Sequence, residues 1–428
     1  MEEVKQDASV ETSGKIDLDE IMRKFDVEAR FRTLSGWQAL MVSIIAIAMS
    51  LFHLYTSGMG LLLAIKQGAV HLAFALSLIF LLYPASSKGR KDSIPWYDLV
   101  LAAVAAFSSM YLVIFFNDLI TRAGLPTTTD LAMGFVLIAL LLEATRRVSN
   151  PILPGIAIFS LLYCYFGRYF PDMFAHRGFD IPRIVNHMYL GTEGIFGVPL
   201  GVSSTFVFMF ILFGTFLEQT GMGKFIIDLA MAIAGWSTGG PAKVAVVSSG
   251  LMGTISGSSV ANVCTTGMFT IPLMKSVGYR PYFAGAVEAV ASTGGQIMPP
   301  VMGAAAFIMA EFLGIPYIKV ALAAVIPALL YYLAVIVQVH LEASRLGLKG
   351  LPREQLPHIW SLLKSKGQLL IPLIGIIYFL LAGYTPIKAA FYGILLNMAC
   401  SYLNRETALT LPKYRNALEN GARTALGV

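Results

Sequence analysis

Long apolar runs separated by short polar segments dominate this 428-residue chain between residues 38 and 403. Many of these runs reach the roughly 18 residues that are typical of a membrane-spanning helix. The pattern therefore predicts an all-α polytopic membrane protein. The expected spans lie near residues 38–56, 67–84, 97–116, 131–148, 152–170, 196–217, 318–341, 369–384 and 386–403, and two irregular stretches, 241–276 and 281–312, interrupt the series.

The first irregular stretch, residues 241–276, is too long for a single span. Its centre, the sequence GTISGSS of residues 253–259, is rich in glycine and serine, which loosen helices. Each flank of about 15 residues rises only about 22 Å, whereas the hydrocarbon core of a bilayer is about 30 Å thick. We therefore expect a re-entrant hairpin, in which two half-helices enter and leave the membrane on the same side.

The second irregular stretch, residues 281–312, contains the sequence STGGQIMPP at residues 292–300. Two glycines and two prolines open the backbone hydrogen-bond ladder there. Irregular backbone at membrane depth is tolerated only where protein buries it or where it lines a cavity. Such broken helices are typical of secondary transporters, in which half-helix N-termini attract anions and C-terminal carbonyls coordinate cations.

The positions of the lysines and arginines indicate the orientation of the chain. With the N-terminus inside and a re-entrant hairpin, 24 of the 31 Lys and Arg residues fall on the cytoplasmic side, as the positive-inside rule expects. A single crossing at 241–276 would move the basic loops at 345–366 and 405–423 to the outside and remove most of this excess. Residues 1–36, which are polar and mixed in charge, are then a cytoplasmic tail.

Composition excludes several classes of function. Charged residues make up 13% of the chain and hydrophobic residues 56%, against about 25% and 45–50% in soluble proteins. These values exclude a soluble enzyme, a disordered chain and a nucleic-acid-binding domain. The sequence also lacks the motifs GxxxxGK[ST], HExxH, GxSxG and GxGxxG, so we expect no enzyme activity. The three cysteines lie far apart and the six histidines lack metal-ligand spacing, which argues against a metal cofactor.

The two irregular stretches resemble the large membrane subunit of tripartite ATP-independent periplasmic (TRAP) transporters, at GTISGSSVAN (253–262) and STGGQIMPPVMGAAA (292–306). The likeness is greatest to the fused permeases of the TAXI branch. It implies that residues 37–149 are a four-helix domain similar to the small subunit. It also implies that residues 150–428 are the first part of the large subunit, an elevator-type fold whose second repeat and second hairpin are missing from this sequence.

The resemblance further implies a Na⁺-coupled symporter of the bacterial or archaeal cytoplasmic membrane. Such permeases import organic anions, usually carboxylates, that a TAXI-type periplasmic solute-binding protein delivers. They move the substrate by an elevator mechanism and use no cofactor, with Na⁺ as the coupling ion. A divalent-anion/Na⁺ symporter of the same superfamily that needs no binding protein is the alternative. A passive channel is less favoured, because the sequence shows no rings of charge.

The predicted substrate and ion site combines the two breaks. Short oxygen-bearing side chains at the hairpin tip suit a hard cation such as Na⁺, and we expect Ser256, Ser258 and Asn262 to bind it together with nearby carbonyls. Small residues at the tip also suit close helix packing, so that interpretation stays open. The whole predicted site consists of Thr254, Ser256, Gly257, Ser258, Ser259, Asn262, Thr293, Gly294, Gly295, Gln296, Pro299 and Pro300.

Three polar features outside this site have alternative interpretations. Glu288 lies two turns inside the membrane from Arg280 and off the bilayer centre, where a charge would cost roughly 2.5–3.5 kcal/mol. Either a salt bridge with Arg280 or a role in the site is expected. The outer loop 171–195 either docks the binding protein or forms a solvated interfacial helix. Residues 218–239 are expected to form an amphipathic helix along the inner surface.

Overall fold

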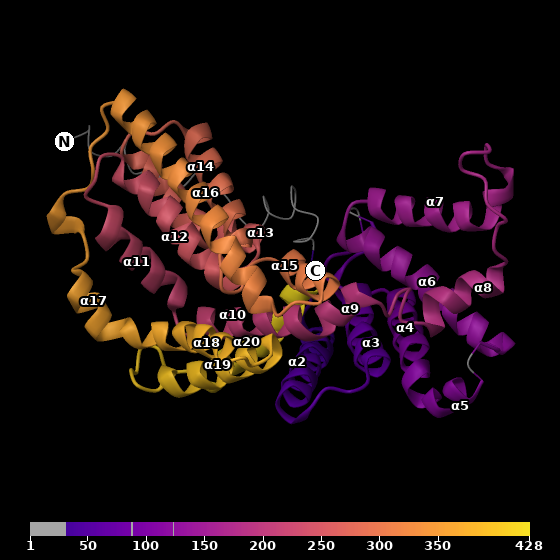
Figure 1. Ribbon diagram of the computed structural model, residues 1–428. Helices are drawn as coiled ribbons and strands as arrows, with labels where there is room; N and C mark the ends of the chain where they lie inside the picture. The colour runs from indigo at the N-terminus through magenta and orange to yellow at the C-terminus, as the bar shows by residue number, and fades with distance from the viewer. Residues whose placement is uncertain (1–30, 87–88, 123) are drawn as a thin grey trace, which may run out of the picture. The chain divides into compact units, whose positions relative to one another are not determined.

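The computed structural model describes residues 31–86, 89–122 and 124–428, and these residues contain helices and loops but no strand (Figure 1). Most of the predicted cytoplasmic tail, residues 1–30, lies outside the described residues. The chain divides into two compact units, one with residues 31–45 and 72–191 and one with residues 46–71 and 192–426. Helices α2 (Gly36–Met59) and α3 (Ala64–Leu82) contribute to both units.

The first unit is a group of helices in which α6 (Thr128–Val148) packs against α4 (Trp96–Ile114). The hydroxyl of the buried Tyr189 donates to the Ser108 carbonyl of α4 at 2.6 Å. A β-carbon on Gly134 of α6 would lie 2.9 Å from the Tyr189 ring, so this glycine permits the close packing. The remaining elements are α5 (Phe116–Thr121), α7 (Ile152–Phe166), η2 (Gly167–Tyr169), α8 (Ile181–Val185) and η3 (Asn186–Leu190).

A buried ion-pair cluster connects the helices of the first unit. The Asp98 carboxylate of α4 is fully buried and accepts from Arg147 of α6 at 2.8 Å and from Arg32. Arg32 also donates to the Phe80 carbonyl at 3.0 Å, and Arg147 donates to the Tyr83 carbonyl at 3.2 Å. The two guanidinium groups therefore tie α4 and α6 to the C-terminal end of α3.

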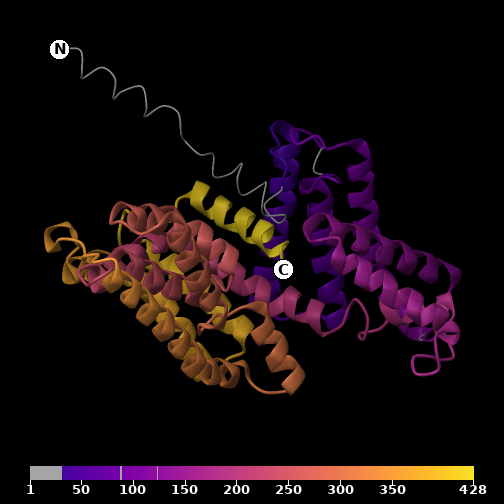
Figure 2. The same cartoon turned by 90° about the horizontal axis from the view of Figure 1, so that it is seen from above.

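The second unit contains the two irregular stretches. Helices α12 (Gly240–Ser256), α13 (Ser259–Ser276), α14 (Pro281–Gly294) and α16 (Tyr317–Arg345) lie side by side in Figures 1 and 2, and we call them the hairpin bundle. The other elements are α9 (Val198–Val202), η4 (Ser203–Val207), α10 (Phe208–Gln219), α11 (Met222–Ala234), η5 (Gly295–Ile297), α15 (Ala304–Leu313), η6 (Arg353–Gln355), α17 (Ile359–Lys366), η7 (Gly367–Leu369), α18 (Leu370–Leu381), α19 (Pro386–Ser401) and α20 (Leu411–Ala425).

The structure confirms both predicted irregularities. The chain reverses between α12 and α13, which pack against each other, so an unbroken helix from 241 to 276 is excluded. The stretch 281–312 is divided into α14, the 3₁₀ turn η5 and α15. The other predicted spans are all helical. By length and composition, seven described helical segments can cross a membrane: Gly36–Met59, Ala64–Leu82, Trp96–Ile114, Ile152–Tyr169, Val198–Gln219, Tyr317–Arg345 and Arg353–Leu381.

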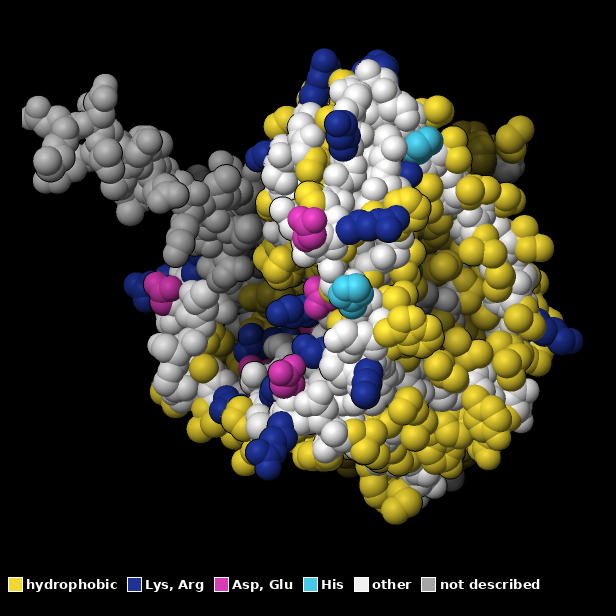
Figure 3. Space-filling model, turned by 90° about the vertical axis from the view of Figure 1, so that its left-hand side faces the viewer, with side chains coloured by type: hydrophobic (Ala, Val, Ile, Leu, Met, Phe, Trp, Pro, Cys, Tyr) yellow, Lys and Arg dark blue, Asp and Glu magenta, His cyan; other side chains and the backbone are white. Residues whose placement is uncertain are grey.

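Large apolar side chains cover much of the surface, as expected where lipid is the solvent. Figure 3 shows hydrophobic side chains covering most of the right and lower side of this view, whereas charged side chains are scattered mainly over its upper, central and left parts. A soluble protein rarely exposes so large a continuous apolar surface. On α16 alone, the exposed apolar side chains are Leu322, Ile326, Leu329, Leu330, Leu333, Val337 and Leu341. This surface agrees with the prediction of a polytopic membrane protein.

We expect Asp98→Asn to destabilise the protein strongly. The substitution leaves the buried guanidinium group of Arg32 without a counter-charge and removes one of the two carboxylates that pair with Arg147, the other being Glu143; breaking such a buried pair costs about 3–5 kcal/mol. The temperature of unfolding of the purified protein in detergent measures the effect. The control is Glu342→Gln, because Glu342 pairs with the exposed Arg345 and such a pair contributes at most about 1 kcal/mol. Equal unfolding temperatures for both variants would contradict the buried ion pair.

Candidate functional site

The tip of the hairpin is a two-residue turn made of Gly257 and Ser258. Gly257 has φ 60, in the left-handed region that ends many helices. A β-carbon at Gly257 would overlap the Met302 carbonyl oxygen, so glycine is required there for space as well as for conformation. Ser258 caps α13 by accepting from the Ala261 amide at 3.3 Å. The Gly-Ser sequence thus sets the sharp reversal.

The break after α14 is a short segment between η5 and α15, residues 298–303. The Gly303 amide donates to the Gln296 carbonyl at 2.8 Å and closes this segment into a loop. The hydroxyl of the buried Tyr317 lies within hydrogen-bonding distance of two carbonyls and shares its proton between Pro300, at 2.8 Å, and Val301. Backbone carbonyls that the broken helix leaves free therefore find partners in α16.

Tyrosines of α16 also hold the end of α14 next to the break. Tyr331 donates to the Val290 carbonyl at 2.7 Å and Tyr332 to the Ala291 carbonyl at 2.9 Å. A β-carbon on Gly294 would overlap the ring of Tyr331. The tyrosine rings can therefore lie this close to the helix end only because residue 294 is glycine.

The two breaks touch each other. A β-carbon on Gly253 of α12 would overlap the Cα atom of Gly295, and a β-carbon on Gly295 would lie 2.7 Å from the Cα atom of Gly253. The Gln296 side-chain amide donates to the Ser259 hydroxyl at 3.1 Å. The backbone of α12, the start of α13 and the break after α14 therefore meet in one place, as the sequence predicts.

The predicted site residues fall into three groups by exposure. Ser256, Gly257, Ser258, Ser259 and Pro299 are half-buried, whereas Thr293 and Gln296 are exposed at the break. Thr293 donates to the Ala289 carbonyl of its own helix at 2.8 Å, and Ser256 approaches the Ser258 carbonyl at 3.4 Å. The other members, Thr254, Asn262, Gly294, Gly295 and Pro300, are buried.

Asn262 lies below the tip and joins the two arms of the hairpin. Its side chain is fully buried, and its amide donates to the Ser249 carbonyl of α12 at 2.8 Å. The hydroxyl oxygen of Ser258 already accepts the capping hydrogen bond from Ala261. Of the three predicted Na⁺ ligands, Ser256 and Ser258 therefore lie at the turn, while Asn262 braces the hairpin from within.

Glu288 occupies a polar cluster that the site prediction does not include. Of the two interpretations left open for Glu288, the structure contradicts the salt bridge with Arg280. The Arg280 guanidinium donates to the Tyr282 hydroxyl at 2.8 Å, and the fully buried Glu288 side chain contacts hydroxyls of the hairpin helices. Its carboxylate contacts hydroxyls that follow helical spacing in the sequence, with Thr266 and Thr270 on α13 and Ser292 four residues after Glu288. Ser249 of α12 completes the cluster. The four-residue spacing of these polar side chains on α13 and on α14 is the sequence signal from which the cluster could have been predicted.

Two of the remaining predictions concern amphipathic segments. Residues 222–234 form α11, as expected for the 218–239 stretch, and its apolar face is buried against α12 and α17. In the outer loop, residues 181–190 form α8 and η3 and pack against α6 through Val185 and Tyr189. This part of the loop therefore belongs to the core of the first unit.

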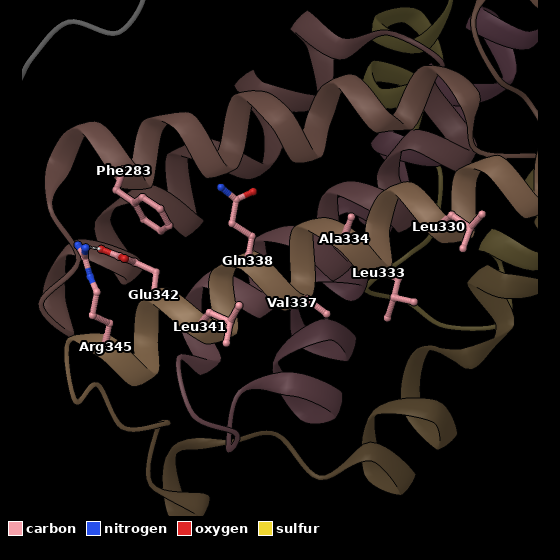
Figure 4. A pocket seen from close by; sticks show the side chains of 9 residues that line it. All are labelled: Phe283, Leu330, Leu333, Ala334, Val337, Gln338, Leu341, Glu342 and Arg345. Atoms are coloured by element: carbon pink, nitrogen blue, oxygen red, sulfur yellow. Dashed lines mark hydrogen bonds and ion pairs between the residues drawn. The ribbon is translucent and has the colours of Figure 1, made fainter.

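A shallow groove lies away from the two breaks. Figure 4 shows that it follows one face of α16, with Phe283 of α14 at one end beside the ion pair of Glu342 and Arg345. Its other lining residues are Leu330, Leu333, Ala334, Val337, Gln338 and Leu341. This mostly apolar groove contains none of the predicted site residues. The candidate site remains the place where the two breaks meet.

Comparison with known proteins identifies related sequences. The family model of the "Tripartite ATP-independent periplasmic transporter, DctM component" matches residues 136–428, which is more than half of the chain. The match includes the whole hairpin bundle and both breaks. It also begins before residue 150, where the sequence prediction places the start of the large-subunit part.

Individual relatives cover smaller parts of the chain. The C4-dicarboxylate TRAP transporter large permease protein DctM of Vibrio cholerae is 34% identical over 34% of this chain and 31% of its own length. The 2,3-diketo-L-gulonate TRAP transporter large permease protein YiaN of Escherichia coli is 28% identical over 43% of this chain and 44% of its own length. The Isethionate TRAP transporter permease protein DctMQ of Oleidesulfovibrio alaskensis is 26% identical over 74% of this chain and 50% of its own length. The chain thus spans half or less of these curated relatives.

We expect Gly253→Ala to separate the two breaks. The added methyl group would overlap the backbone of Gly295, which cannot move as a flexible side chain does, so we expect a loss of about 1–3 kcal/mol in the free energy of unfolding. The matched control is Gly285→Ala in α14, because a β-carbon at Gly285 has open space around it and alanine favours a helix by up to about 1 kcal/mol. Thermal unfolding in detergent compares the variants. Equal stability of the two would argue against the backbone contact.

Proposed function

Because this chain belongs to the DctM family of tripartite ATP-independent periplasmic transporters, we propose that it is the permease of a secondary, Na⁺-coupled importer of organic anions. It lies in the cytoplasmic membrane with its N-terminus inside and receives its substrate from an extracytoplasmic solute-binding protein of the TAXI type. The match to a fused DctMQ permease supports a small-subunit part and a large-subunit part within one chain.

One observation carries this proposal, namely the meeting of four helix ends. The C-terminal ends of α12 and α14 and the N-terminal ends of α13 and α15 converge where Gly253 contacts Gly295 and Gly257 approaches Met302. Helix N-termini present partially positive N–H groups to an anion, and C-termini present partially negative carbonyls to a cation. The convergence favours binding of Na⁺ and a carboxylate side by side.

The side chains at this point have complementary roles in the proposed mechanism. Ser256 and Ser258, with carbonyls at the end of α12, bind Na⁺, while Asn262 keeps the hairpin arms together. The exposed Gln296 and Thr293 hold the substrate carboxylate through hydrogen bonds. The hairpin bundle then slides as one body in an elevator movement, and the four-helix part that includes residues 37–149 remains still.

The named relatives support organic anions as the substrate class. Their names refer to C4-dicarboxylate, 2,3-diketo-L-gulonate and isethionate, and each of these compounds carries an acidic group. A site built from helix N-termini and neutral hydroxyl and amide groups recognises the acidic group and leaves the rest of the substrate to other contacts. We therefore propose a small organic acid without assigning its carbon skeleton.

Reconstitution tests this proposal directly. The protein, in the form that its gene encodes, is placed in proteoliposomes with an inward Na⁺ gradient, a labelled organic acid and a cognate solute-binding protein. We expect accumulation above equilibrium only when both the gradient and the binding protein are present. Accumulation without the binding protein would favour the divalent-anion symporter, and equilibration without accumulation would favour a channel.

Replacement of Gln296 tests the proposed substrate contact. Gln296→Ala removes the amide that donates to Ser259 and that is proposed to hold the substrate, and we expect a roughly two- to tenfold loss in kcat/KM of uptake, as for one hydrogen bond. Gln338→Ala is the matched control, because Gln338 lies in the groove along α16 (Figure 4). If both substitutions reduce uptake equally, Gln296 has no special role.

A further inference from the structure

The carboxylate of Glu288 is a buried charge in the middle of the hairpin bundle. The residue is 0% exposed. Among residues 31–86, 89–122 and 124–428, no lysine, arginine or histidine forms an ion pair with it. An unpaired carboxylate in a water-excluded interior is strongly unfavourable, and inside a membrane such residues are usually paired or functional. A counter-charge for Glu288 must therefore come from outside the side chains that surround it.

Hydroxyl groups from three helices surround the carboxylate. Ser249 of α12 and Ser292 of α14 lie 3.0 and 3.2 Å from Glu288 Oε1. Thr266 of α13 also contacts Oε1, and Thr270 contacts Oε2. All four groups are neutral, so they solvate the carboxylate without balancing its charge.

Two of these hydroxyls have a competing acceptor. Thr266 Oγ1 lies 2.8 Å from the Asn262 carbonyl oxygen, and Thr270 Oγ1 lies 3.0 Å from the Thr266 carbonyl oxygen. Each hydroxyl has a single proton to donate, so Glu288 shares the protons of both threonines with the helix backbone. A bound cation would relieve this competition, because it neutralises the carboxylate and accepts the lone pairs of the hydroxyl oxygens.

The other ionisable groups on the packed helices have partners elsewhere or lie near helix ends. On α12, Lys243 donates to Ser237 at 3.2 Å and lies 3.2 Å from His340. On α16, Glu342 pairs with Arg345, and Tyr331 and Tyr332 donate to carbonyls of α14. The remaining ionisable groups are Cys264 and Lys275 on α13, Arg280 and Tyr282 at the start of α14, and Tyr317 and Lys319 at the start of α16.

We propose that Glu288, together with the hydroxyl oxygens of Ser249, Thr266, Thr270 and Ser292, is a binding site for a monovalent cation, either H⁺ or Na⁺. The ligand atoms are all oxygen, the type that hard cations prefer. The site lies within the bundle and does not include the hairpin tip. Its use as an additional coupling site rests on the transport function proposed above.

The site is connected to the hairpin tip through Ser249. The Ser249 hydroxyl donates to Glu288, while its carbonyl accepts from the Asn262 amide. Asn262 belongs to the first turn of α13, next to the capping residue Ser258. A cation at Glu288 therefore acts on the same residues that hold the two arms of the hairpin together.

Cation titrations of the purified protein, in the form that its gene encodes, test the site without any substrate. Infrared difference spectra follow the carboxyl bands while either Na⁺ is added at fixed pH or the pH is lowered at fixed salt. We expect one carboxyl band that responds to a cation in the unmodified protein and is lost in Glu288→Gln. Glutamine keeps the size and hydrogen bonding of the side chain but cannot bind a cation as a carboxylate does. The matched control Glu342→Gln should retain the band.

The two arms of the titration distinguish the cation. A band that responds only to acid identifies H⁺, and a band that responds to Na⁺ at fixed pH identifies Na⁺. Thr270→Val provides a second variant that keeps the carboxylate, and we expect a roughly tenfold weaker response because one hydroxyl ligand is lost. Identical titrations for the unmodified protein, Glu288→Gln and Thr270→Val would overturn the proposal.

The outcome for this site is independent of the outcome for transport. A Glu288-dependent cation response in a protein that accumulates no organic acid would contradict the proposed transport function and support the site. Conversely, uptake by Glu288→Gln with unchanged dependence on both the Na⁺ and the pH gradient would overturn the coupling role of the site while leaving transport intact.

Discussion

Two backbones touch where Gly253 of α12 lies against Gly295 after α14, and neither position has room for a β-carbon. Close backbone contact inside a membrane is favourable because small residues allow helices to approach. Here it also joins a hairpin tip to a helix break, so the polar groups of both irregularities share one location. The Gln296–Ser259 hydrogen bond and the approach of Gly257 to Met302 connect the same two segments beside this contact.

A break of this kind is stable only if its free backbone groups find partners, since lipid offers none. Tyrosines of α16 meet this requirement: Tyr317 binds carbonyls in the broken segment, while Tyr331 and Tyr332 bind carbonyls near the end of α14. The same helix exposes an apolar surface on its other side. α16 therefore supports the irregular backbone on one face and meets lipid on the other, which explains how a long regular helix and two broken ones occur together.

The sequence was sufficient to predict the helices and the positions of both breaks, because glycine, serine and proline act locally on the backbone. The turn at Gly257–Ser258 and the break at 295–303 both follow from such residues. The sequence did not reveal that Asn262 donates to Ser249 across the hairpin, or that Glu288 faces hydroxyls and not Arg280. Those contacts depend on how helices rotate against each other, which hydropathy does not encode.

The position of Glu288 bears on how a hairpin bundle could move as one body. Its carboxylate contacts side chains from α12, α13 and α14. All three helices therefore surround the same negative charge. An apolar side chain there would leave the three helices joined by packing alone, whereas a carboxylate that takes a cation gives them a common electrostatic partner. In a low-dielectric interior such an interaction is strong and falls steeply when one helix withdraws. The bundle is therefore most cohesive when the charge at its centre is neutralised.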